Sequence, residues 1–420
     1  MVIGKGNKEK LLSEAEVFEI CQEAFSIRDL KDKKILAIIP DHTRSGPIDV
    51  MFRTVYKLLA DKAELLDFII AAGTHPPMSD EAINHRVGIT SEERINIYSK
   101  SRFFNHHWSD PDQLTSIGTI SKSEVSEISN GLMEEDVNIT INKMVFNYDV
   151  LMIIGPTFPH EVVGFSGGNK YLFPGIAGQE IIDMFHWLGA LISNPNIIGH
   201  ADTPVRKVVD RAVTFLPMER LCLSLVVKQE GLAGLYIGSP EEAWRSAAEL
   251  SDKIHIIYKD HPFKKVLSCL PTMYDELWTG GKGMYKLEPV VADGGELIIY
   301  APHIKEISLA HGEIIKKIGY HTRDYYLKQM DRFKDIPGGV MAHSTHVKGI
   351  GSFDNGVERP RIEVVLATGI PEAVCEKINL GYRDPNSINV DEWKNREDEG
   401  ILYVPNAGEW LYRLKDDPFS

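Results

Sequence analysis

The stretch that decides the fold runs from residue 34 to residue 77, KILAIIPDHTRSGPIDVMFRTVYKLLADKAELLDFIIAAGTHPP. Two apolar runs in it, Lys34–Ile39 and Leu65–Ala72, are typical of buried strands. Between them, the segment Pro47–Lys62 carries apolar residues at helical spacing, which predicts a helix with one buried face. That face consists of Ile48, Phe52, Val55 and Leu59. Alternation of strand, helix and strand predicts a parallel sheet.

Polar loops follow three of the expected strands. Pro40-Asp41-His42-Thr43-Arg44 follows the first strand and Gly73-Thr74-His75-Pro76-Pro77 follows the second. The strand expected at Val150–Ile154 leads into Gly155-Pro156-Thr157-Phe158-Pro159-His160. Because parallel sheets bind ligands beyond the carboxyl ends of their strands, we expect these loops to line one site.

The length of 420 residues indicates more than one domain. A second series of strands is expected after His261-Pro262, so we place a domain boundary near residue 260. The expected fold class is α/β, with two α/β domains, mainly parallel sheets and the active site in the cleft between the domains. The first domain spans residues 1–260 and is completed by the tail 401–420, and the second spans 261–400.

Composition excludes several classes of protein. The chain has 46 Lys and Arg against 60 Asp and Glu, a net charge of −14, which argues against general nucleic-acid binding. Its apolar runs fall short of the roughly 20 residues of a membrane helix, and no signal-peptide pattern opens the chain. The four cysteines lie far apart in sequence, so neither a cysteine-rich metal site nor a disulfide framework is expected. We predict a reduced, cytoplasmic protein.

The densest motif is HEVVGFSGGNKYLFPG, residues 160–175. Its glycines permit positive φ and close backbone approach, so a loop next to Lys170 suits a phosphate or carboxylate, although a plain tight turn has the same composition. Gly164–Gly168 also satisfies G-x-S-x-G, with Ser166 as nucleophile. The P-loop pattern fails because Asn169 precedes the lysine, and the zincin pattern fails because Gly164 replaces its second histidine.

Histidines and cations give further candidates. His75 and His160 follow strand ends and suit acid–base catalysis on two faces of one carbon. His186 lies in the helix expected at Gln179–Ala190, where a lone histidine is usually a hydrogen-bonded core residue. For His106 and His107, a structural role is the simplest interpretation. Arg44 and Lys282 suit a carboxylate, or are ordinary surface charges.

Together these motifs resemble the nickel-dependent lactate racemase family, which includes 2-hydroxyacid racemases and epimerases. The resemblance rests on these segments: Asp41-His42-Thr43-Arg44, Gly73-Thr74-His75-Pro76, residues 160–175, His186 and Lys282-Gly283-Met284. It implies an isomerase that uses a nickel-pincer nucleotide, a pyridinium bis-thiocarboxylate mononucleotide that holds Ni. It also implies a cofactor-binding first domain, a substrate-closing second domain, and cofactor-biosynthesis and nickel-insertion enzymes as partners.

The resemblance further implies roles for single residues. Lys170 would carry the cofactor through a thioamide link and His186 would be the protein ligand of nickel, since imidazole is a suitable nickel donor. One of His75 and His160 would remove the hydroxyl proton while the C2 hydrogen leaves as hydride, and the other would serve the opposite enantiomer through a planar 2-keto acid. The remaining cofactor contacts would come from Asp41, Thr43, Gly167 and Gly168. The substrate contacts would come from Arg44, Lys282, Trp278 and Thr279.

The second half departs from the lactate-racemising pattern. Trp278-Thr279-Gly280-Gly281 stands where Tyr-Gln-Ala-Val is typical, which predicts a larger substrate pocket. Further along lie four histidines, His303, His311, His343 and His346. This set is unusually polar for a pocket that closes on the methyl group of lactate. We therefore expect a polyhydroxylated sugar acid, similar to D-gluconate and epimerised at C2. Lactate or another short 2-hydroxy acid is the alternative, with these histidines as surface or core residues.

Two other classes of function stay open on the sequence. One is a serine hydrolase that uses Ser166, and the other is a non-catalytic binding protein for an anionic metabolite. The sequence does not fix the exact substrate, whether the chain forms a homo-oligomer, or whether a given preparation carries the cofactor.

Overall fold

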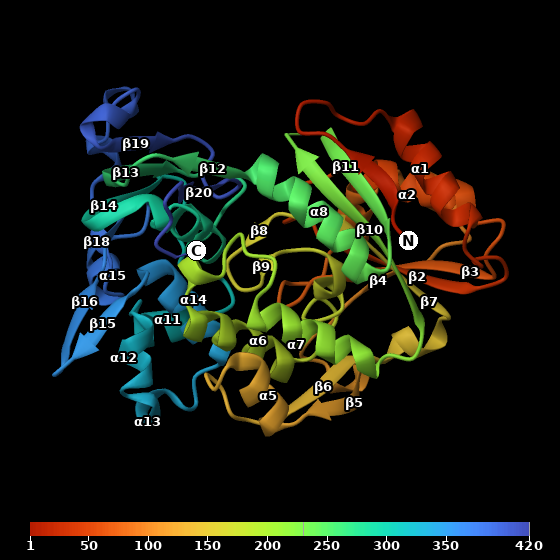
Figure 1. Cartoon of the computed structure of the whole chain (residues 1–420), viewed down its shortest axis with the longest axis horizontal. Helices are drawn as coiled ribbons and strands as arrows, with labels where there is room; N and C mark the ends of the chain where they lie inside the picture. The colour runs from red at the N-terminus through yellow and green to blue at the C-terminus, as the bar shows by residue number, and fades with distance from the viewer. Residues whose placement is uncertain (230, 420) are drawn as a thin grey trace. The chain divides into compact units, whose positions relative to one another are not determined.

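The computed structural model describes residues 1–229 and 231–419, which divide into two compact units (Figure 1). Unit 1 contains Met1–Phe158, Phe165–Ile182 and Ala201–Ile254. Unit 2 contains Pro159–Gly164, Asp183–His200 and residues 255–419. Both units are α/β with mainly parallel sheets, as the sequence predicts.

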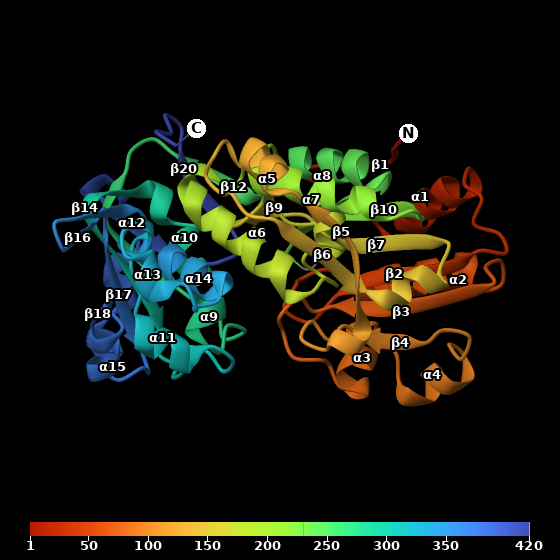
Figure 2. The ribbon, with the colours of Figure 1, turned by 90° about the horizontal axis from the view of Figure 1, so that it is seen from below.

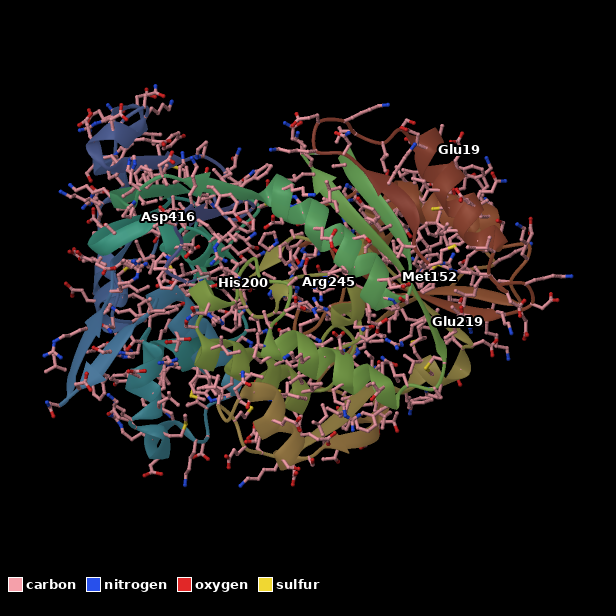
Figure 3. All side chains as sticks on the ribbon, viewed as in Figure 1. Glu19, Met152, His200, Glu219, Arg245 and Asp416 are labelled. Atoms are coloured by element: carbon pink, nitrogen blue, oxygen red, sulfur yellow. The ribbon has the colours of Figure 1, made fainter. Side chains whose placement is uncertain are left out.

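Unit 1 is built on a seven-stranded sheet of order β1-β11-β10-β7-β2-β3-β4. Its strands are β1 (Ile3–Gly6), β11 (Gly231–Gly238), β10 (Glu219–Lys228), β7 (Val150–Pro156), β2 (Lys34–Pro40), β3 (Leu65–Ala71) and β4 (Phe103–Asn105). Strands β10 through β4 run parallel, and β11 and β1 add antiparallel pairs at one edge. Met152, labelled in Figure 3, lies on the central strand β7 and is completely buried. The predicted strands at 34, 65 and 150 are therefore confirmed, and their carboxyl ends lie at one edge.

Helices α1 (Glu14–Ser26) and α2 (Ile48–Leu59) pack on one face of this sheet (Figure 2). α2 buries the predicted stripe, and the Phe52 ring meets the ring of Phe68 on β3 edge-on at 5.0 Å. α1 begins with a capping box in which Ser13 and Glu16 satisfy each other's backbone N–H groups, a common device at helix starts. The remaining elements of unit 1 are α3 (Asp80–Arg86), α4 (Ser91–Asn96), β5 (Leu114–Ile120), α5 (Lys122–Ser129), β6 (Val137–Asn142), α7 (Pro204–Ala212) and most of α8 (Pro240–His255).

Unit 2 is built on a five-stranded parallel sheet of order β18-β17-β14-β13-β19. Its strands are β18 (Gly381–Tyr382), β17 (Glu363–Thr368), β14 (Val291–Ala301), β13 (Phe263–Cys269) and β19 (Ile401–Val404). A second pair joins β12 (Ile256–Lys259) to β20 (Leu411–Leu414), and a hairpin joins β15 (Gly351–Asp354) to β16 (Val357–Pro360). The helices are α9 (Leu277–Gly280), α10 (Lys282–Tyr285), α11 (Gly312–Ile318), α12 (Arg323–Leu327), α13 (Met330–Phe333), α14 (Gly338–Lys348), α15 (Glu372–Lys377) and most of α6 (Gln179–Ile192).

The division into units differs from the sequence-based one in two places. The tail 401–419 belongs to unit 2, because β19 pairs with β13 from Lys265 opposite Ile401 onward. The segments Pro159–Gly164 and Asp183–His200 also belong to unit 2, although they lie within the predicted first domain 1–260. A four-residue strand such as β19 fits the edge of either sheet by its apolar pattern alone, so the sequence could not decide between them. Across the described residues, none of the helices combines the length and apolarity needed to span a membrane.

Candidate active site

In unit 1, Asp41 and His75 form a close pair at the carboxyl ends of β2 and β3. Asp41 Oδ2 lies 2.6 Å from His75 Nδ1, and Asp41 is 3% exposed. Its other oxygen, Oδ1, accepts from the hydroxyl of Thr43 at 2.6 Å and from the backbone N–H of Thr43 at 3.0 Å. Burial raises the pKa of Asp41, but the hydrogen bond from His75 and the positive charges of His75 and Arg44 outweigh burial and hold that pKa well below its usual range.

An ionised carboxylate can only accept, so the hydrogen of the His75–Asp41 bond is on Nδ1 of His75. In the neutral ring the other nitrogen, Nε2, then carries the lone pair, which is the form required of a general base. Asp41 therefore fixes the tautomer of His75.

Arginine side chains surround this pair. Arg44 donates from Nη1 to the hydroxyl of Thr43 at 2.9 Å. Arg86 on α3 donates from Nη2 to the carbonyl oxygen of Arg44 at 2.7 Å and from Nε to that of Pro40 at 3.3 Å. The half-buried guanidinium of Arg44 is thus braced beside a carboxylate that is already satisfied, which leaves a positive region suited to an anion. Arg86 could not be predicted from the sequence, since one arginine in the last turn of a helix looks like any surface cation.

The glycine-rich loop is held by two side chains that the sequence did not single out. Arg206 on α7 donates to the carbonyl oxygens of Phe165 and Gly167 at 2.5 and 3.3 Å, and its guanidinium lies 4.0 Å from the centre of the Trp244 ring. Trp244 on α8 donates its indole N–H to the carbonyl oxygen of Ser166 at 2.8 Å. Burial lowers the pKa of Arg206 to about 10, so its charge is retained at neutral pH.

Ser166 is part of this bracing. Its hydroxyl donates to the carbonyl oxygen of Pro156 and accepts the N–H of Phe158, both at 3.1 Å, and the residue is 4% exposed. A serine nucleophile needs its hydroxyl bonded to a base and open to the substrate. The geometry of Ser166 is that of a loop brace, which disfavours the hydrolase alternative.

Gly167 and Gly168 have φ values of 85° and 59° and cannot be replaced by larger residues without strain. A Cβ on Gly167 would lie 2.4 Å from the hydroxyl oxygen of Thr157. That hydroxyl is completely buried and has no hydrogen-bond partner within residues 1–229 and 231–419. A buried hydroxyl without a partner beside a glycine-rich loop suits a polar group bound there.

Lys170 follows directly in a short 3₁₀ turn, Gly168–Tyr171. Its carbonyl oxygen accepts the N–H of Gly175 at 3.1 Å, and the carbonyl oxygen of Gly175 accepts the N–H of Gly73 at 3.0 Å. These bonds tie the Lys170 loop to the loop of His75. Unit 1 thus brings together His75, Asp41, Thr43, Arg44 and the loop that carries Lys170.

In unit 2, His160 lies beside a half-buried carboxylate, that of Glu161. His160 Nδ1 is 3.5 Å from Glu161 Oε2 and accepts the N–H of Val162 at 3.1 Å. Burial raises the pKa of Glu161, but the positive charge of His160, a backbone hydrogen bond and the charge of Lys282 hold it well below its usual range. In the sequence Glu161 belongs only to a failed zincin pattern, yet each candidate histidine has a carboxylate near its Nδ1.

A histidine-rich group in unit 2 contains several residues whose roles the sequence left open. The Trp278 ring stacks on His343 at 4.0 Å and lies 4.7 Å from the ring of His311. His343 Nε2 is 3.3 Å from the hydroxyl of Tyr320, and burial is the main reason that its pKa falls to about 3. His346 is also buried, with a pKa lowered to about 4 by burial and by nearby His186. These imidazoles are therefore neutral at physiological pH.

Three further predicted residues have simpler surroundings. His303 Nε2 lies 3.0 Å from the carbonyl oxygen of Tyr274, and Thr279 donates its hydroxyl to the carbonyl oxygen of Glu276 at 3.2 Å. Lys282 is half-buried, with its ammonium 5.0 Å from the centre of the Tyr274 ring.

His186 lies on α6, half-buried, with its ring edge-on to Phe185 at 5.2 Å. It also acts electrostatically on His343 and His346, so it faces polar neighbours. Throughout the described part of the chain, no three or more His, Cys, Asp or Glu side chains are grouped as ligands for a metal ion.

Comparisons with known proteins match this chain to lactate racemases. Residues 9–198 match the family described as the lactate racemase N-terminal domain. The chain is 24% identical to a lactate racemase of Thermoanaerobacterium thermosaccharolyticum over 286 residues, which are 66% of this chain and 62% of that protein. It is 26% identical to a lactate racemase of Lactiplantibacillus plantarum over 165 residues, which are 38% of this chain and 34% of that protein. The match thus spans less than two thirds of the length of either relative.

Two solved structures match nearly the whole length of this chain. A crystal structure of a protein from Thermotoga maritima matches with a TM-score of 0.88 and 34% identity, over 98% of this chain and 100% of the other. The lactate racemase apoprotein of T. thermosaccharolyticum matches with a TM-score of 0.74 and 18% identity, over 98% and 94% of the two chains, and shows the fold alone. Residues 9–198 therefore belong to the lactate racemase N-terminal domain family, and the curated proteins that the chain matches are lactate racemases.

Proposed function

We propose that this protein is an isomerase that inverts C2 of a 2-hydroxy acid with the help of a nickel-pincer nucleotide. The observation that carries the proposal is the Asp41–His75 pair, 2.6 Å apart at the carboxyl ends of β2 and β3, on a loop tied to that of Lys170. Family membership supports the same reaction class, since both curated relatives are lactate racemases.

The residues fit such a cofactor. Lys170 supplies an amine for a covalent link, and the Gly167–Gly168 turn has no Cβ atoms beside the unpaired hydroxyl of Thr157. Asp41 and Thr43 complete the cofactor contacts that we propose, and His186 supplies the single imidazole ligand for nickel. When bound, the cofactor supplies an acceptor for the hydride that leaves C2 and returns to its other face. The protein therefore depends on enzymes that make the cofactor and insert nickel.

Proton transfer falls to the two histidines. Nε2 of His75 takes the hydroxyl proton of one enantiomer, and ionised Asp41 stabilises the imidazolium that results. For the other enantiomer we propose His160, which has Glu161 Oε2 3.5 Å from its Nδ1. In the structure this Nδ1 accepts the N–H of Val162, so the neutral ring carries its proton on Nε2. To take a substrate proton at Nε2, His160 has to move its own proton to Nδ1, where Glu161 would accept it.

Arg44 and Lys282 hold the substrate carboxylate in this proposal. The guanidinium of Arg44 is oriented through Thr43, which leaves further N–H groups for two parallel bonds to a carboxylate. A carboxylate held in this way presents C2 and its hydroxyl in one orientation, which lowers the entropic cost of reaching the transition state.

The polar neighbours in unit 2 favour a polyhydroxylated sugar acid over lactate. His343 is neutral, and a neutral imidazole offers one donor and one acceptor, which matches hydroxyl groups. The methyl group of lactate offers neither, so buried polar atoms would stay unpaired at a cost of about 1–3 kcal/mol each. Trp278 and Thr279 complete the substrate contacts that we propose. The alternative, a short 2-hydroxy acid as substrate, rests on the lactate racemase relatives.

A substrate panel on cofactor-loaded protein tests this choice. The panel contains D-gluconate, a four-carbon aldonate, glycerate and lactate, and the product is the C2 epimer measured by chiral chromatography. We expect kcat/KM for an aldonate to exceed that for lactate at least tenfold, and His343→Phe to reduce this preference because it removes the polar atoms and keeps a ring against Trp278. Turnover of lactate without turnover of any aldonate would assign the short-acid function instead.

A further inference from the structure

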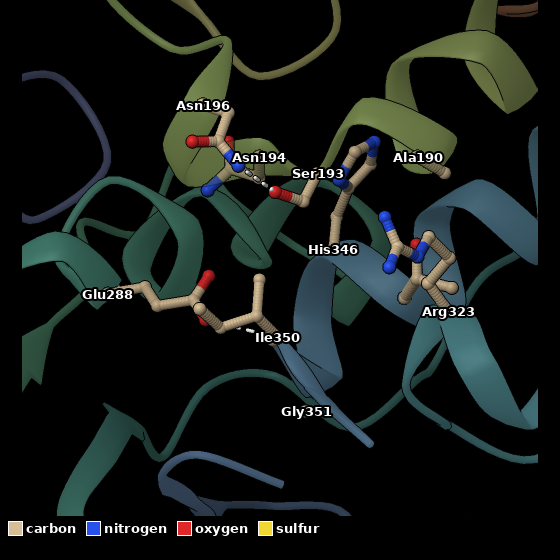
Figure 4. A pocket seen from close by; sticks show the side chains of 11 residues that line it. Ala190, Ser193, Asn194, Asn196, Glu288, Arg323, His346, Ile350 and Gly351 are labelled. Carbon is tan, nitrogen blue, oxygen red and sulfur yellow. Dashed lines mark hydrogen bonds between the residues drawn. The ribbon is translucent and has the colours of Figure 1, made fainter. Parts of the chain in front are cut away.

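A cavity of about 220 Å³ lies entirely within unit 2, and its lining does not include His160 or Glu161 (Figure 4). Its wall includes the end of α6, the short turn Asn194–Asn196, the end of α14 and the start of β15. None of the proposed catalytic, cofactor or substrate contacts is in this wall. It therefore needs an explanation of its own.

Three buried polar atoms in the cavity wall have no hydrogen-bond partner among the described residues. They are Oε2 of Glu288, Oδ1 of Asn194 and Nε2 of His346, in side chains that are 0%, 3% and 4% exposed. The other ends of two of these side chains are fixed: Glu288 Oε1 accepts the N–H of Ile350 at 2.8 Å, and Asn194 Nδ2 donates to the carbonyl oxygen of Tyr285 at 2.8 Å. Each therefore holds one unsatisfied atom in a set place, which is the arrangement of a binding site rather than of a loose surface.

The charges around the cavity disfavour an ionic ligand. Arg323 already donates to the carbonyl oxygen of Leu191 at 2.7 Å and to Asp324 Oδ1 at 3.1 and 3.2 Å, so its charge is largely compensated. Glu288 is fully buried, and burial raises its pKa despite the opposing charge of Arg361. An anion would meet Glu288, and a cation would meet Arg323, without a dedicated counter-ion.

We propose that this cavity binds a small neutral polyol of three or four carbons. A hydroxyl group both donates and accepts, so it pairs with Glu288 Oε2 whether that atom carries a proton or not, and with either tautomer of His346. It also donates to Asn194 Oδ1, which only accepts. Since one water takes about 30 Å³ of liquid volume, the cavity has room for roughly seven water-sized groups, close to the size of glycerol or erythritol.

Isothermal titration of the full chain with erythritol and glycerol tests the proposal. We expect saturable binding of one polyol per chain, and loss of at least tenfold in affinity in Ala190→Leu, which fills the cavity from α6. Thr345→Val is the matched control: this side chain also lines the cavity, but its hydroxyl already donates to the carbonyl oxygen of Ala342, so affinity should change less than threefold. Circular dichroism checks folding, and Ile350→Phe replaces the first variant if Ala190→Leu does not fold.

Each other outcome overturns the proposal. An absence of binding up to about 100 mM polyol would mean that water alone satisfies the three atoms. Full affinity in the filled variants would place the polyol elsewhere, and loss of binding in Lys282→Ala would place it among the proposed substrate contacts. Binding of potassium or acetate in competition with erythritol would assign a charged ligand instead.

Discussion

Replacing Asp41 by Asn should disable His75 without removing it. In the structure, Asp41 Oδ1 accepts two hydrogen bonds from Thr43, and Oδ2 accepts one from His75. An amide at position 41 will keep its oxygen toward the two donors of Thr43, which turns its NH₂ group toward His75 Nδ1. His75 will then accept at Nδ1 and carry its proton on Nε2, the atom that has to take the substrate proton.

The expected loss follows from two contributions. A hydrogen bond to a charged group contributes about 1.5–3 kcal/mol, and about 1.4 kcal/mol corresponds to a tenfold change in rate, so loss of the ion pair alone lowers kcat by about tenfold to 150-fold. The wrong tautomer removes acid–base catalysis by His75, which contributes about 10²- to 10⁴-fold in all and already includes the loss of the ion pair. We therefore expect kcat of Asp41→Asn to fall by about 10² to 10⁴, with the larger loss for the enantiomer that His75 serves.

The assay is the rate of C2 inversion, started from each enantiomer separately, on protein loaded with cofactor. Nickel content is measured in parallel to separate a catalytic loss from a failure to load. Thr43→Ser is the matched control, because it changes the same loop but keeps the hydroxyl, the backbone donor and the His75 contact, so its loss should stay within about tenfold. Fully loaded Asp41→Asn with a rate within threefold of the wild type would refute the role of this pair.

Three further predictions concern the loop and the core. Gly167→Ala places a Cβ 2.4 Å from the Thr157 hydroxyl at a φ of 85°. We expect a loss of about 1–3 kcal/mol in unfolding free energy and a loss of cofactor loading, measured by urea unfolding and nickel content. Unchanged loading would contradict a role of the Gly167–Gly168 turn in holding the cofactor. Ser166→Ala should lower stability by about 1–3 kcal/mol but keep inversion activity within about tenfold, and a folded, loaded but inactive variant would return Ser166 to the list of catalytic residues. His106 is buried, and burial is the main reason that its pKa falls from about 6.5 to about 4. As the pH falls, the unfolded chain therefore binds a proton at His106 before the folded chain does. The stability that neutral His106 contributes is complete above about pH 6.5 and is lost as the pH falls toward 4. His106→Gln should therefore lose less stability than the wild type between pH 6.5 and 4.5 in urea unfolding, and equal slopes would show that His106 is already protonated in the folded protein.

The sequence predicted the central sheet of unit 1 well because its signals are local. Lys34–Pro40 and Val150–Pro156 are continuous apolar runs that end in polar loops, and a parallel sheet fixes where such loops lie. The same logic places Asp41 and His75 at one edge from the sequence alone. Their 2.6 Å contact and the buried state of the carboxylate needed the structure.

Side chains that contact the site from distant parts of the sequence could not be predicted. Arg206 and Trp244 hold the glycine-rich loop from α7 and α8, but each looks like an ordinary helical residue in sequence. Glu161 lies in the motif itself, but its low pKa comes from the adjacent His160, a backbone hydrogen bond and also Lys282, more than a hundred residues later. The allocation of β19 to unit 2 is of the same kind, since pairing between distant segments leaves no periodic pattern.

The most direct test of the central claim is the nickel content of the protein together with the mass of the peptide that contains Lys170. The protein is produced alongside the enzymes that make the cofactor, with Lys170→Ala and His186→Ala as paired variants. The account predicts about one nickel per chain and a mass adduct on Lys170, no adduct in Lys170→Ala, and loss of nickel in both variants. An unmodified Lys170 peptide without nickel, under conditions that load a known lactate racemase, would contradict it.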